Sequence, residues 1–319
     1  MRQTRPYEDA FGGEAEAWRG TVIGPNRDRR IYVPWSLGKE VTLHFVMNHW
    51  GETRAGAPLI LLTTGPFGSG KTVIVDECLY RLGVKVTAIQ GSELESPMAG
   101  VPAERIEKLY MQAGMEQEET KRPHAILLSD LDTGIGVHDS FKSGTTNLMH
   151  VTNALMTFAD DPTTVRGQSC GRVCLFVTAN AAGRIYGAVT RPGRARVIPW
   201  CPEGREREDI ARHILSPVLS PEMIDLVLAR TPHWTMAHYG ALKNGVLEDT
   251  AVSRFGDVEP KQLLRALLAD PAPASDEPNR DQAISWEALA HLIGRINKHI
   301  EAVQTDHTQP TGVTTGELP

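Results

Sequence analysis

The sequence predicts an α/β protein in which helices cover a parallel sheet, followed by a small all-helical domain. Three observations support this fold class. Apolar runs typical of strands buried on both faces alternate with helical patterns up to about residue 200. A glycine-rich string at 65–72 directly follows the first of these runs. Beyond residue 200 the strand-like runs stop and only helical patterns remain.

Five apolar runs predict the strands of the sheet. An apolar pattern that begins at Ile31 leads into the first of them, and the five runs are Pro58–Thr64, Val84–Ile89, Ala125–Leu128, Val173–Val177 and Arg196–Pro199. Helical patterns lie between the runs at Thr72–Leu82, Ala103–Met115 and Val151–Ala159. Because strand and helix alternate, we expect βαβ units and a single α/β domain over residues 31–200.

Residues 201–304 are predicted to form a helical domain. Its expected helices are Glu203–Leu215, Pro221–Ala229, Ala237–Leu247, Pro260–Leu268 and an amphipathic helix that ends near Gln304. A segment rich in Pro, Asp and Asn at 270–279 is expected to be a loop, and the tail 305–319, which has almost no large apolar residue, is expected to be disordered. Residues 1–30 are polar with charges of both signs. They predict a partly disordered N-terminal extension, with a basic arm for a partner as the alternative.

Composition limits the kind of function. The 319 residues include 33 Lys and Arg against 39 Asp and Glu, a net charge of −6 that disfavours a constitutive nucleic-acid binder. No window approaches the roughly 18 apolar residues of a membrane-spanning helix, and the first ten residues lack the apolar core of a secretory signal. Four irregularly spaced cysteines predict neither a disulfide framework nor a zinc site. We therefore expect a cytoplasmic protein with no membrane or nucleic-acid partner.

The glycine-rich string matches the phosphate-binding pattern G-x-x-x-x-G-K-S/T without deviation. Its residues are Gly65, Pro66, Phe67, Gly68, Ser69, Gly70, Lys71 and Thr72, placed between a buried strand and an amphipathic helix as the motif requires. The glycines allow backbone N–H groups to surround phosphate oxygens, and the helix adds the positive end of its dipole. Lys71 is expected to reach the β- and γ-phosphates, and the Thr72 hydroxyl to bind Mg²⁺. This predicts a site for a nucleoside triphosphate with Mg²⁺.

An acidic residue at the end of a neighbouring strand completes such a site, and the segment His124–Asp132 supplies it. Two registers are open. Either Asp130 is the acid that faces the metal, or Ser129 takes that place and Asp130 replaces the Glu that polarises the attacking water. The second register puts Asp132 where many such ATPases carry another Asp, although Asp132 also suits a helix or turn cap.

Two further polar features follow the acid. Asn180 comes at the end of the next strand, where it either orients the hydrolytic water or serves as a turn residue. Arg191 and Arg194 flank a Pro-Gly turn before the last strand. They are either solvated or, in a ring-forming ATPase, face the γ-phosphate of the neighbouring subunit and stabilise charge in the transition state.

Taken together, these features resemble the AAA+ ATPases, and within them the Rubisco activases of the plant and green-algal type. The resemblance covers roughly residues 30–300 and is carried by unusual strings in a fixed order. The strings are Gly91-Ser-Glu-Leu-Glu-Ser96, Ser129-Asp-Leu-Asp-Thr-Gly-Ile-Gly136, Ser143-Gly-Thr-Thr146, Asn153-Ala-Leu-Met156, Ala159-Asp-Asp-Pro-Thr163, Val177-Thr-Ala-Asn180, Arg191-x-Gly-Arg194 and Tyr239-Gly-Ala-Leu-Lys243.

The resemblance implies an AAA+ nucleotide-binding domain over 31–200 and a small helical lid over 201–304. It implies a homo-oligomeric ring, expected to be a hexamer, that uses ATP hydrolysis to pull on inhibited Rubisco and release sugar-phosphate inhibitors. Arg191 and Arg194 correspond to trans-acting arginines and Asn180 to a sensor. The segments Glu93–Pro102 and Gly134–Thr146 correspond to two loops that line the central pore.

The sequence also departs from that family. Lys243 stands where the family has a sensor arginine. Lysine keeps the positive charge of arginine but cannot form its bidentate hydrogen bonds, so we expect the helical domain to contact the nucleotide differently. We expect a bacterial or cyanobacterial homologue, or a stromal protein if the source is a plastid. Two alternatives remain: an ATPase that remodels another protein client, and a slow nucleotide-dependent assembly module, which Ser129 and Lys243 favour.

Overall fold

The computed structural model describes residues 21–23, 31–94, 98, 100–134, 146–185, 187–255 and 284–308. The chain divides into two compact units, residues 1–203 and 204–319, and each is described by itself. The helix predicted at 260–268 and the loop predicted at 270–279 lie outside the described residues, as does most of the second pore-loop segment.

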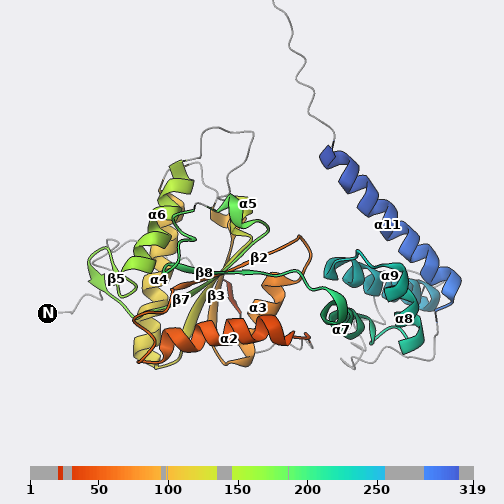
Figure 1. The fold of residues 1–319 in the computed structure, drawn as a ribbon, viewed down its shortest axis with the longest axis horizontal. Helices are drawn as coiled ribbons and strands as arrows, with labels where there is room; N and C mark the ends of the chain where they lie inside the picture. The colour runs from red at the N-terminus through yellow and green to blue at the C-terminus, as the bar shows by residue number, and fades with distance from the viewer. Residues whose placement is uncertain are drawn as a thin grey trace, which may run out of the picture. The chain divides into compact units, whose positions relative to one another are not determined.

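A six-stranded sheet forms the centre of the first unit (Figure 1). In spatial order its strands are β1 (Thr21–Ile23), β3 (Lys85–Gln90), β4 (His124–Ser129), β7 (Cys174–Ala179), β2 (Ile60–Thr64) and β8 (Ala195–Pro199). The five strands from β3 to β8 are parallel, which confirms the predicted sheet, and β1 is antiparallel to β3 at one edge. Each predicted apolar run coincides with one of the parallel strands.

Helices cover both faces of this sheet. The elements are α2 (Trp35–His49), α3 (Lys71–Arg81), η1 (Gly91–Leu94), α4 (Val101–Thr120), α5 (Leu131–Gly134), α6 (Thr146–Asp160) and η2 (Ala182–Arg184), with a small hairpin of β5 (Thr164–Val165) and β6 (Gln168–Ser169). Helices α3, α4 and α6 are the predicted ones. Helix α2 has no predicted counterpart, because only an apolar pattern was recognised there.

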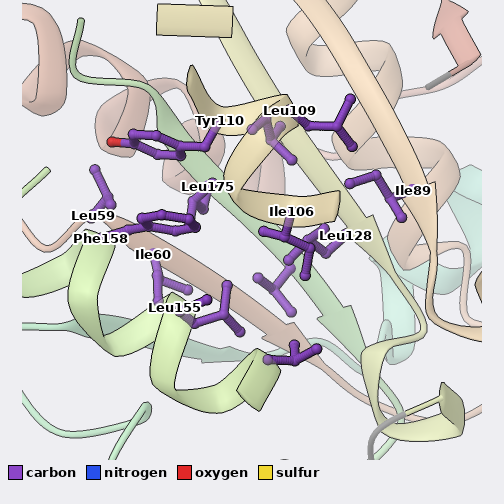
Figure 2. Close-up of a cluster of buried hydrophobic side chains, with 14 of the residues drawn as sticks. Leu59, Ile60, Ile89, Ile106, Leu109, Tyr110, Leu128, Leu155, Phe158 and Leu175 are labelled. Carbon is purple, nitrogen blue, oxygen red and sulfur yellow. The ribbon is translucent and has the colours of Figure 1, made fainter. Parts of the chain in front are cut away.

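Alternating strand side chains separate two layers of core. On one face Ile126, Leu128, Leu175 and Val177 pack with side chains from α4 and α6, including Phe158. Figure 2 shows this cluster, in which the rings of Tyr110 and Phe158 stack with centroids 4.3 Å apart. The residues between them in the strands point to the opposite face, where Phe176 meets His44 of α2 edge to face at 5.2 Å. Thus α2 and α3 cover the second face.

The second unit is helical throughout its described part. It contains α7 (Gly204–Leu215), α8 (Pro221–Arg230), α9 (Met236–Phe255) and α11 (Trp286–Thr308). Helix α8 begins as its sequence predicts: Ser220 caps it by accepting a hydrogen bond from the Met223 N–H at 3.3 Å, and a proline follows. Helix α11 continues four residues past the predicted end at Gln304, into the segment expected to be disordered. Among the described helices, none is long and apolar enough to cross a membrane.

Candidate functional site

The strand order brings the phosphate loop, Asp130 and Asn180 together at the carboxyl end of the sheet. Strand β2 lies between β7 and β8, while the chain after β2 crosses over to β3. Ligands of open α/β sheets bind at such a reversal, beyond the carboxyl ends of the strands. The phosphate-loop string follows β2, Asn180 follows β7 and Asp130 follows β4, so all three emerge side by side.

The phosphate loop depends on glycine at three positions. Gly68 and Gly70 have φ angles of 71° and 83°, in the left-handed region that side chains disfavour. A Cβ on Gly65 would lie 1.8 Å from the Trp200 carbonyl oxygen, so no other residue fits there. Pro66, Phe67 and Gly68 are exposed at the top of the loop, whereas Ser69 is buried. The loop is therefore tightly held on one side and open to solvent on the other.

Lys71, the first residue of α3, is buried and points into this loop. Its Nζ donates to the carbonyl oxygens of Gly65 (2.8 Å) and Pro66 (2.9 Å) and to Oδ1 of Asn180 (3.1 Å). Burial lowers the pKa of the Lys71 ammonium, and the carboxylates of Asp130 and Asp132 oppose that shift. Since its three acceptors are uncharged, an anionic phosphate oxygen would be a stronger partner for the ammonium group.

Thr178 connects two predicted magnesium-site residues. Its Oγ1 lies 2.9 Å from Oγ1 of Thr72 and accepts a hydrogen bond from the backbone N–H of Asp130 at 3.1 Å. Thr178 is fully buried near the end of β7 and points to the face covered by α3. Sequence reasoning missed this residue. Its position within β7, two residues before Asn180, is the signal that could have identified it.

Asp130 lies just beyond β4 in a left-handed conformation, with φ of 50°. Burial raises the pKa of its carboxyl group, the nearby Lys71 ammonium lowers it, and Asp132 raises it further. Strand alternation puts Ser129 on the same face as Thr178, with Leu128 in the opposite core. The side chain at Ser129 therefore faces the layer that contains α3, and Asp130 follows it at the edge of the sheet.

Asp132 is completely buried and fixes the end of β7. Its two carboxylate oxygens accept hydrogen bonds from the Asn180 N–H (3.0 Å each), the Asn180 amide Nδ2 (3.2 Å) and the Ala181 N–H (3.3 Å). Asn180 Oδ1 is thereby aimed at Lys71. Asp132 thus caps a turn between two strand ends, as one reading of its sequence position predicts, and it also orients Asn180.

Trp200 is a second residue that sequence reasoning missed. It follows β8 and is 4% exposed. Its backbone N–H donates to the Thr64 carbonyl at 2.5 Å, and its indole Nε1 donates to the Ser69 carbonyl at 2.9 Å. One tryptophan therefore holds both ends of the phosphate loop.

The two arginines lie at the other end of the sheet. The Ile60 N–H, at the start of β2, donates to the Arg194 carbonyl at 3.2 Å, whereas the phosphate loop follows the end of β2. Four strand steps, roughly 13 Å, separate the two ends. Arg194 is bound to Asp160 of α6 in a bidentate ion pair, and this hydrogen bond raises its pKa. Neither arginine joins the phosphate site of its own chain.

The remaining predicted residues lie elsewhere. Lys243 is half-buried on α9 of the second unit. In the first pore-loop segment, Arg105 binds both the carbonyl oxygen (2.7 Å) and the carboxylate (3.1 Å) of Glu93, so that acidic charge is neutralised within the chain.

Comparison with known proteins agrees with this geometry. Residues 61–202 match the family described as "ATPase family associated with various cellular activities (AAA)". The chain is 29% identical over 217 residues to a ribulose bisphosphate carboxylase/oxygenase activase of Anabaena sp., a match that covers 66% of this chain and 52% of the relative. A chloroplastic activase of Nicotiana tabacum is 27% identical over 293 residues, covering 87% of this chain and 65% of the relative. The chain thus spans about half the length of the cyanobacterial relatives it matches. The match over residues 61–202, the parallel sheet flanked by helices and the small helical unit after it together give the chain the α/β AAA+ fold.

Proposed function

We propose that this protein hydrolyses ATP in a homo-oligomeric ring and uses the reaction to remodel inhibited Rubisco, releasing tightly bound sugar-phosphate inhibitors. The observation that carries the proposal is the pair of hydrogen-bond chains at the carboxyl end of the sheet. One runs from Lys71 through Asn180 to Asp132, and the other from Thr72 through Thr178 to Asp130. They link the phosphate loop to the residues expected to act on water.

In this proposal the loop N–H groups and Lys71 bind the phosphates. Mg²⁺ bound with the nucleotide would neutralise developing charge, and the Thr72 hydroxyl would supply one of the oxygen ligands that this ion prefers. In the register where Asp130 faces the metal, its carboxylate would supply a second. Among the described residues, no group of three or more His, Cys, Asp or Glu could hold a metal ion by itself. In this proposal the ion takes its other ligands from phosphate and water, as Mg²⁺ ordinarily does.

Asp130 and Asn180 are the proposed catalytic residues for water attack. The face occupied by Ser129 supports the register in which Asp130 stands in the place of the usual Glu and polarises the water. Asn180, held by Asp132, orients that water. An Asp130→Asn variant should bind ATP without hydrolysing it; loss of binding as well would favour the metal-ligand register instead.

Arg191 and Arg194 are the proposed contribution of the neighbouring subunit. Their distance from the phosphate loop of their own chain supports action on another chain, and an arginine at the γ-phosphate accelerates hydrolysis about 10³–10⁵-fold. Hydrolysis should therefore depend on protein concentration. The contact of Lys243 with nucleotide stays a prediction.

The Rubisco client is supported by the names of the relatives and by the order of the matching strings. The test is to mix purified protein, ATP and inhibitor-locked Rubisco and to follow recovery of carboxylation. Recovery with wild type and none with Lys71→Ala would support the proposal. ATP hydrolysis without recovery would refute Rubisco as the client and favour a different protein client, an alternative compatible with the 27–29% identity to the activases.

A further inference from the structure

The two arginines of the turn before β8 differ sharply in their surroundings. Among the residues that the structure describes, the exposed Arg191 side chain makes no hydrogen bond or ion pair. Arg194 is the opposite case: its side chain is 23% exposed and is bound through three of its nitrogen atoms.

The contacts of Arg194 use most of its guanidinium. Nε and Nη2 donate to the two carboxylate oxygens of Asp160 at 2.7 and 2.6 Å, and Nη1 donates to the Ala188 carbonyl at 3.1 Å. A fork-to-fork arginine–carboxylate pair is the strongest geometry available to these groups. For Arg194 to bind a phosphate, the pair would have to break and leave the Asp160 carboxylate without its cation.

The backbone around Arg194 fixes the rest of the turn. Its N–H and that of Ala195 donate to the Arg191 carbonyl at 3.0 and 3.2 Å, and its own carbonyl accepts from Ile60 of β2. Gly193, with φ of 96°, allows this tight turn. Arg194 therefore ties the turn to α6 through its side chain and to the sheet through its backbone, and it leaves Arg191 at the exposed corner.

From this difference we propose a division of roles, which rests on the ring proposed above. Arg191 contacts the phosphate of the neighbouring subunit, and Arg194 with Asp160 is a positioning pair that holds the turn carrying Arg191. Nothing in the sequence separates the two arginines, because Asp160 lies 34 residues away on another element.

The test compares steady-state kcat for ATP in Arg191→Ala, Arg194→Ala, Asp160→Asn and the Arg194→Ala/Asp160→Asn double variant, at concentrations where wild type is fully assembled. Arg191→Ala should lose about 10³–10⁵-fold in kcat. Arg194→Ala and Asp160→Asn should each lose about 10²-fold in kcat, because a slightly misplaced Arg191 stabilises the transition state less well. The double variant should lose no more than either single variant. The KM for ATP should stay near that of wild type, because each chain keeps its own phosphate loop. Glu107→Gln, which breaks the 2.8 Å pair with Arg166 in the same unit, is the matched control and should not change kcat.

Exchange of the charges gives the sharpest readout. If Arg194 works only through Asp160, the double variant Arg194→Asp/Asp160→Arg should have a kcat at least tenfold higher than that of Arg194→Asp alone. If Arg194 itself binds a phosphate, no such recovery is expected, because an aspartate at position 194 would repel the phosphate. An Asp160→Asn variant as active as wild type, alongside an inactive Arg194→Ala, would overturn the inference, as would near-normal activity of Arg191→Ala. Light scattering with ATP distinguishes these results from failure of the ring: a monomeric wild type whose specific activity is independent of concentration would refute the ring itself.

Discussion

Two buried histidines should make the protein lose stability in mild acid. His44 of α2 is 2% exposed and its Nε2 bonds to the Leu59 carbonyl at 3.2 Å. Burial lowers its pKa to about 3, helped by Arg196, Arg172 and His49 and opposed by the Leu59 hydrogen bond. His124, at the start of β4, is 3% exposed, and burial lowers its pKa to about 4, with Glu116 opposing and Lys85 helping.

The lowered pKa values of His44 and His124 give both the direction and the size of the change in unfolding free energy with pH. Both imidazoles are neutral in the folded state and take up a proton on unfolding once the pH falls below the ordinary value of 6.5. The unfolded state then binds more protons, so stability falls as pH falls. Each histidine contributes about 1.4 kcal/mol per pH unit over the 1.5 units between 6.5 and 5, which is about 2 kcal/mol. Together they should cost about 4 kcal/mol of unfolding free energy between pH 7 and pH 5.

Urea unfolding at pH 7 and pH 5 measures this loss for wild type, His44→Gln and His44→Gln/His124→Gln. Glutamine keeps an N–H donor but does not titrate. Between pH 7 and pH 5, the unfolding free energy should therefore fall by about 2 kcal/mol less in the single variant than in wild type, and by about 4 kcal/mol less in the double variant. The same change at the exposed His233 is the control and should leave the loss unaltered. If His44→Gln loses as much between the two pH values as wild type does, the reasoning is wrong.

Three substitutions test the phosphate site. Lys71→Ala should bring ATP turnover below detection, because water cannot replace a cation at the β- and γ-phosphates; turnover near that of wild type would contradict the assignment. Asp132→Asn replaces one of the two acceptor oxygens by an NH2 donor, so the Asn180 and Ala181 N–H groups are left to share a single acceptor. The kcat should therefore fall about 10²-fold while a fluorescent ATP analogue still binds, and an unchanged kcat would argue against positioning. Trp200→Phe leaves the Ser69 carbonyl without its donor, so unfolding free energy should fall by about 1–3 kcal/mol and the Kd for ATP should rise; no change in either would remove the loop-holding role.

The strands were predictable from the sequence and α2 was not, for a physical reason. The three central strands β4, β7 and β2 are buried on both faces, so their apolar runs are nearly continuous. Helix α2 lacks the usual separation of an apolar buried face from a polar exposed face. Its buried face includes His44 and Asn48, while Trp35 is 79% exposed and Val46 is 44% exposed. Because polar and apolar side chains occur on both faces of α2, the helical period does not emerge from the sequence.

The site was predictable where its chemistry is local and not where it depends on tertiary packing. The phosphate loop carries its own pattern, and Asp130 and Asn180 follow recognisable strands. The partners that position them come from distant elements. Thr178 supports Asp130 across 48 residues, and Trp200 supports Ser69 across 131. The strand order makes those contacts possible: β7 lies beside β4 for the first, and β8 lies beside β2 for the second.

Trp200 also gives the phosphate loop little freedom to move alone. The Trp200 carbonyl packs directly on Gly65 and its indole holds Ser69, so displacing either end of the loop must displace the Trp200 peptide or break its bonds. Only three residues separate Trp200 from Gly204, where α7 of the second unit begins. A change in the conformation of the phosphate loop would therefore displace the backbone at the end of β8, because Trp200 directly follows that strand.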